Sequence, residues 1–131
     1  MKKYISALLA AAFSASTFAA LESPITASTE INSPETVNSQ LIVRSLDGKN
    51  VQLKISGPDA LLTSTKSGYS IDLEKNTSLL IEYNGGLNIT PENSGVSIRN
   101  GASMTVNRIV GDVKMAKVVV WGGTLTIRKE N

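Results

Sequence analysis

The residue types that most often carry out chemistry are missing from this 131-residue chain, which contains no His and no Cys. Without these side chains, the usual ligand sets for zinc, copper and iron cannot form. A Ser-His or Cys-His nucleophile system is equally impossible. The composition therefore predicts no metal, no cofactor and no catalytic residues of these kinds.

Eleven Asp and Glu residues remain as candidate chemical groups. They do not form the Asp-x-Asp-x-Asp-Gly pattern of a calcium loop. Two carboxylates can also hydrolyse glycosides, and Asp72 and Glu74 share one face of an expected strand. We interpret this pair as a solvated stripe, so the sequence predicts that the protein is not an enzyme.

Two further sets of side chains have a binding and a structural interpretation. Trp121 and Tyr83 could stack on a sugar, but we interpret them as core or turn-packing residues. Lys114 and Lys117 precede the apolar run Val118 to Val120. Lysines at such places commonly protect the edge of a sheet from unwanted pairing, and we interpret them in that way.

The first nineteen residues have the pattern of a cleavable signal peptide. Lys2 and Lys3 precede a short apolar stretch, and small residues then lead to Ala19. We expect cleavage after Ala19 or Ala20, with a signal anchor as the alternative. The apolar stretch is shorter than the roughly 20 residues that a membrane span needs. The pattern predicts export by the Sec route to the periplasm, without a membrane span.

Export also changes the charge of the chain. The precursor has thirteen Lys and Arg residues against eleven acidic ones, and the signal peptide removes Lys2 and Lys3. The mature chain is therefore nearly neutral, with its basic residues scattered. This balance predicts no nucleic-acid partner.

After the signal peptide, short segments of alternating apolar and polar residues recur, and Gly, Asn, Asp and Pro separate them. Asp47 to Asn50 and Asn84 to Gly86 are expected hairpin turns, and Asn100-Gly101 is a further expected turn. Eight or nine such strands predict an all-β fold, an antiparallel β-sandwich of the immunoglobulin type. A small β-solenoid is the alternative, although no fixed internal period is visible.

The first mature strand has the pattern of a donor strand, which would complete the sheet of a neighbouring subunit. Its residues Ile25, Ala27, Thr29 and Ile31 would enter alternating pockets. On this interpretation, residues 20–34 form an N-terminal extension and residues 35–131 form the sandwich. An ordinary edge strand paired within its own domain is the alternative.

Three segments resemble major pilins of the alpha class of chaperone–usher fimbriae, the colonisation-factor type. Leu21 to Asn32 is similar to the mature N-terminus of that family, Asp47 to Ile55 to its early hairpin, and Trp121 to Ile127 to its closing strand. The chain is shorter than those pilins and has Trp121 where the family usually has Tyr.

The resemblance implies a structural subunit of a surface fimbria that supports adhesion. Its partners would be copies of itself, a periplasmic chaperone, an outer-membrane usher and a possible host receptor. Leu125 and Ile127 would form the edge of the acceptor groove. The alternative function is a soluble periplasmic or secreted β-sandwich protein with a binding or accessory role.

Overall fold

A computed structural model describes residues 21–82, 84–107 and 113–128, and its regular elements are all β-strands. The expected signal peptide and Tyr83 lie outside the described residues. Thirteen strands in these ranges form three sheets, and neighbouring strands run parallel. In the ranges that are described, no helix is long and apolar enough to cross a membrane.

Each sheet takes every third strand of the chain. Sheet I consists of β1 (Thr29–Ile31), β4 (Val51–Ile55), β7 (Thr77–Ile81), β10 (Ser103–Val106) and β13 (Thr124–Ile127). Sheet II consists of β2 (Pro34–Val37), β5 (Leu61–Ser64), β8 (Gly86–Ile89) and β11 (Val113–Lys114). Sheet III consists of β3 (Leu41–Val43), β6 (Tyr69–Leu73), β9 (Gly95–Arg99) and β12 (Lys117–Trp121).

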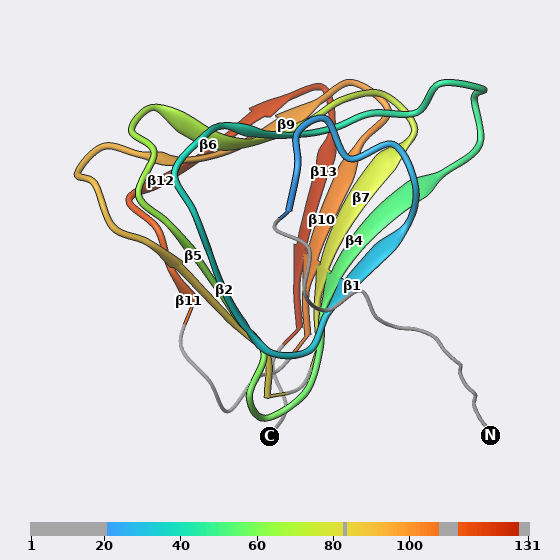
Figure 1. Cartoon of the computed structure of the whole chain (residues 1–131). Helices are drawn as coiled ribbons and strands as arrows, with labels where there is room; N and C mark the ends of the chain where they lie inside the picture. Colours follow the sequence, from blue (N-terminus) through green and yellow to red (C-terminus); the bar gives the residue numbers. More distant parts are fainter. Residues whose placement is uncertain (1–20, 83, 108–112, 129–131) are drawn as a thin grey trace, which may run out of the picture.

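The chain is therefore a β-solenoid of about four turns, in which the three sheets form the sides of a triangle (Figure 1). The prediction of an antiparallel immunoglobulin-like sandwich is wrong, and the alternative of a small solenoid is confirmed. Among the described residues, the antiparallel contact is a single bridge between Arg99 and Gly122.

Unequal turn lengths hid the solenoid from the sequence. In sheet I, Thr29 pairs with Leu53, Leu53 with Leu79, Leu79 with Met104, and Met104 with Leu125. These steps cover 24, 26, 25 and 21 residues. Alternation within a strand survives such variation because its period is two, whereas a repeat of fixed length does not.

Stacked apolar side chains fill the space between the sheets. Ile31, Ile55, Ile81 and Val106 occupy matching positions in successive strands of sheet I, and all four are buried. Burying one such side chain contributes about 1.5–3 kcal/mol relative to leaving it in water. The parallel register therefore builds the core directly from the period-two alternation of each strand.

The expected turns are present, but they do not make hairpins. Gly48 and Gly101 adopt positive φ angles of 85° and 83°, and Asn84 adopts 73°. Glycine and asparagine tolerate this left-handed conformation better than other residues. Each turn leads the chain into the next sheet instead of back along the same one, because turn residues set the local bend and not the strand that is paired.

The N-terminal end of the solenoid, here called the head (residues 21–43), is covered by its own chain. The Ile25 N–H donates to the Ile42 carbonyl at 2.7 Å, and the Arg44 N–H donates to the Ile25 carbonyl at 2.9 Å. The Ile42 N–H donates to Ser23 Oγ at 2.9 Å. Ile25 is buried as part of the core, and the partly buried Leu21 packs against the core. These contacts close the first turn.

Candidate functional site

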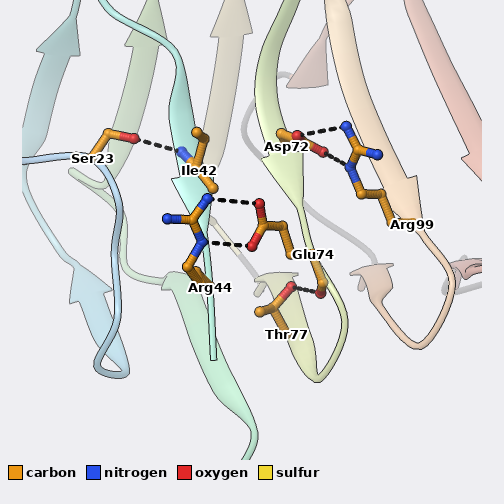
Figure 2. A network of polar contacts seen from close by, with 7 residues as sticks. All are labelled: Ser23, Ile42, Arg44, Asp72, Glu74, Thr77 and Arg99. Carbon is orange, nitrogen blue, oxygen red and sulfur yellow. Dashed lines mark hydrogen bonds and ion pairs between the residues drawn. The ribbon is translucent and has the colours of Figure 1, made fainter. Parts of the chain in front are cut away.

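Two ion pairs organise the outer face of sheet III (Figure 2). Arg44 Nε and Nη2 donate to the two Glu74 carboxylate oxygens at 2.7 and 3.0 Å. Arg99 Nε and Nη2 donate to the Asp72 oxygens at 2.8 and 3.1 Å. Such two-pronged pairs fix both the position and the orientation of a carboxylate.

The interpretation of Asp72 and Glu74 as a solvated stripe is wrong for Asp72, whose side chain is 8% exposed. Arg99 covers it, and Glu74 is half-buried beside Arg44. Each carboxylate accepts two hydrogen bonds from its own guanidinium. This geometry gives a structural role to both carboxylates.

The pKa of the Glu74 carboxyl is lowered, chiefly by the hydrogen bond from Arg44. Burial opposes this shift, and the charge of Arg44 makes a smaller contribution that lowers the pKa further. The pKa of the Arg99 guanidinium is raised, chiefly by its hydrogen bond to Asp72. Both directions favour the charged forms at neutral pH. The sequence did not reveal either arginine as a partner, because each lies 27 or 30 residues from its carboxylate.

The opposite end of the solenoid, here called the tail (residues 113–128), exposes apolar side chains. Val120 is 45% exposed, Trp121 56%, Leu125 37% and Ile127 68%. The counterparts of Val120, Leu125 and Ile127 one turn earlier are Ile98, Met104 and Val106, and all three are buried. Trp121 instead follows the exposed Arg99 on the outer face of sheet III. The tail therefore continues the columns of the core into solvent.

The main chain of β13 is also open at the tail. The Thr124 and Arg128 N–H groups donate to Ala102 and Val106, at 3.1 and 2.8 Å, on the side of β10. Successive residues of a strand direct their main-chain groups to opposite sides. Leu125 and Ile127 consequently direct theirs away from β10, toward the free edge of sheet I, where their apolar side chains are exposed as well.

Thr29 and Ile31, two of the residues expected to donate a strand, lie on β1, and the residues expected to accept one lie on β13; these two strands are the opposite edges of sheet I. In the described structure, the N-terminal segment pairs with its own chain: Thr29 and Ile31 lie on β1 beside β4, and Ile25 bridges to Val43. Ile25 and Ile31 are buried and Ala27 is exposed. Leu125 and Ile127 lie on β13, an edge strand of sheet I.

The other singled-out side chains lie on sheet III. Lys117 begins β12, the edge strand at the tail, and its ammonium lies 5.2 Å from the centre of the Tyr69 ring. Trp121 ends the same strand and is exposed, so of the two expected roles, core or turn packing, the core role is wrong. Over the described ranges, no group of three or more acidic residues is placed to hold a metal ion.

No protein-family model, no curated protein and no solved structure matches this chain.

Proposed function

We propose that this chain is an exported binding or accessory protein that recognises a protein partner through its tail. The observation that carries the proposal is the coincidence of two features on β13. The side chains of Leu125 and Ile127 are exposed and apolar, and their main-chain groups face the free edge of sheet I. Such an edge accepts an added strand, with main-chain hydrogen bonds for affinity and side chains for selectivity.

The contrast with the head supports this assignment of the binding surface. Ser23 and Ile25 cover the first turn, and Ile31 there is only 3% exposed. The apolar side chains are covered at the head and exposed at the tail, so the tail is the end that offers an apolar surface to a partner. The signal-peptide pattern of residues 1–19 supports an extracytoplasmic location.

A structural subunit of a surface polymer is the second candidate. It is favoured by the placement of β1 and β13 at opposite edges of sheet I. Because these two edges lie at opposite ends of one molecule, β13 could pair with β1 only if the two strands came from different copies. The solenoid supplies no sandwich that lacks a strand, so this candidate does not depend on donor-strand exchange.

Site-specific photo-crosslinking tests the proposed binding surface. A photoreactive residue replaces Trp121 in the full precursor, expressed in its own host, and a second one replaces Lys54 on the outer face of sheet I as a control. We expect a protein adduct of discrete mass from position 121 that Ile127→Lys abolishes, with none from position 54. The partner identified from the adduct is then purified and added to the wild-type chain, where it must shift the fluorescence of Trp121, the single tryptophan. No adduct at position 121 would contradict the proposal.

A further inference from the structure

We propose that the tail binds the head of a second copy of this chain, so that molecules stack end to end. This inference rests on the proposed function, namely that the tail is a protein-binding surface, and it names the partner. It is carried by the charges of the two ends and by the register of the strands that would meet.

The two ends of the solenoid carry opposite charge. Residues 21–43 contain Glu22, Glu30 and Glu35 and no basic residue. Residues 113–128 contain Lys114, Lys117 and Arg128 and no acidic residue. All six side chains are exposed or half-buried. Complementary charges steer two surfaces together and disfavour the wrong orientation.

The strands at the two edges are compatible in register. The columns of sheet I extend from Ile31 through its equivalents to Ile127, so stacking places Ile127 beside Ile31 of the next copy. Thr126 then lies beside Glu30 of that copy, and Arg128 follows two residues later on the same outer face. A side chain as long as Arg reaches a carboxylate at that diagonal position.

The hydrogen-bonding directions agree with this register. The Ile31 carbonyl accepts from Ser56 on the side of β4, so the main-chain groups of Glu30 face away from β4. Leu125 and Ile127 face away from β10. In a parallel pair, a residue that faces its neighbour bonds to the residues on either side of its opposite partner. Glu30 would therefore bond between Leu125 and Ile127.

The step of the solenoid keeps Pro34 away from the junction, whereas Pro24 precedes Ile25 at the sheet III edge of the head and lacks an N–H there, so we expect main-chain pairing between copies in sheet I alone. The chain enters the fold at Ile25 beside β3 in sheet III and continues with β1 in sheet I, and it leaves through β12 and β13 of the same two sheets. Stacking therefore brings β13 to β1 of the next copy in sheet I and places β12 next to the Ile25 segment of that copy in sheet III. Pro34, which lacks an N–H, begins β2 in sheet II and lies outside the joined edges.

Tail-to-tail pairing is the competing arrangement. It would also cover Leu125 and Ile127, but it would bring together two copies of Lys114, Lys117 and Arg128 with no acidic residue among residues 113–128. Like charges across an interface oppose association. The charge pattern therefore selects the head as the partner of the tail. Because head-to-tail contacts do not close on themselves, they generate open chains of molecules instead of dimers.

Sedimentation velocity of the mature chain over a range of concentrations tests the stacking. We expect species larger than a dimer that grow with concentration and dissociate at high salt, since the Debye length falls from about 30 Å at 0.01 M to about 3 Å at 1 M. A dimer that never grows, or a monomer at every concentration, overturns the stacking.

Charge reversal identifies the surfaces. Glu22→Lys with Glu30→Lys reverses the head, and Lys114→Glu with Arg128→Glu reverses the tail. Each double variant alone should weaken association by about tenfold or more, and a chain carrying all four changes should recover it. Circular dichroism checks that each variant is folded. Association that is unaffected by head reversal contradicts the head as the partner.

A main-chain variant separates strand pairing from charge. Ile127→Pro removes an N–H that faces the free edge and leaves the bonds of β13 to β10 in place, so it should abolish growth of the stacks. The photo-crosslinking experiment separates this inference from the proposed function. An adduct at position 121 with a different protein overturns the stacking and leaves the binding surface standing, whereas no adduct at all contradicts both.

Discussion

Asp72 on β6 and Arg99 on β9 form a two-pronged ion pair across neighbouring strands, although 27 residues separate them in the chain. The carboxylate is buried and the guanidinium is half in solvent. The pair is possible because one turn of the solenoid returns the chain to the same sheet. The ion pair therefore depends on the parallel stacking of β6 and β9 in sheet III.

Removing Arg99 alone should cost more stability than removing both members of the ion pair. Arg99→Met leaves the Asp72 carboxylate buried without its partner, whereas Asp72→Asn with Arg99→Met leaves no charge behind. We expect the single variant to lose about 1–2 kcal/mol of unfolding free energy and the double variant less, because Arg99 is largely exposed and its pairing is screened. Urea denaturation measures both. Equal losses would show that the buried charge carries no penalty.

The ion pair of Glu74 should make stability depend on pH on the acidic side. Its pKa is lowered in the folded protein, chiefly by the hydrogen bond from Arg44. The stabilisation is therefore complete above the ordinary Glu pKa of about 4.3 and is lost as the pH falls through the lower folded pKa. The difference in urea midpoint between the wild type and Glu74→Gln should be constant from neutral pH to about pH 5 and shrink below that. A difference that grows on acidification contradicts the direction of the shift.

Two buried serines of sheet III should respond oppositely to the same substitution. Ser97 Oγ on β9 is buried and has no hydrogen-bond partner among the described residues, whereas Ser70 Oγ on β6 donates to the Lys66 carbonyl. Ser97→Ala should be neutral or stabilising, because it removes an unsatisfied polar group, and Ser70→Ala should cost about 1 kcal/mol. Thermal and urea unfolding measure the stability of both variants. Equal destabilisation by the two substitutions would contradict the prediction.

Engineered disulfides test the register, and the absence of Cys makes the background clean. Gln52 on β4 and Ser78 on β7 are directly paired on the outer face of sheet I, and Ser103 on β10 is paired with Ser78. Neighbouring parallel strands lie about 4.8 Å apart, which suits a disulfide. Gln52→Cys with Ser78→Cys should oxidise readily.

The matched control for this register is Gln52→Cys with Ser103→Cys, which spans two strand spacings and should stay reduced. Mass spectrometry under mild oxidant distinguishes the outcomes. Rapid oxidation of the control pair and slow oxidation of the adjacent pair would be incompatible with the parallel order of sheet I.

The sequence predicted much of what is local. Period-two alternation located strands such as Val51–Ile55 and identified Leu53 and Ile55 as inward-facing, and both are buried. The turn at Gly48 follows from the positive φ that glycine tolerates. These features depend only on residues close together in the chain, so they can be predicted from the sequence.

Only the tertiary structure decided which strands pair and in which direction. Alternating strands look the same in a sandwich and in a solenoid, and turns of 21 to 26 residues in sheet I conceal the repeat. The partners of Asp72 and Glu74, the burial of Ile25 against its own chain and the exposure of Ile127 at the tail all follow from stacking successive turns. Each of them depends on contacts between residues far apart in the chain, which alternation and turn residues do not encode.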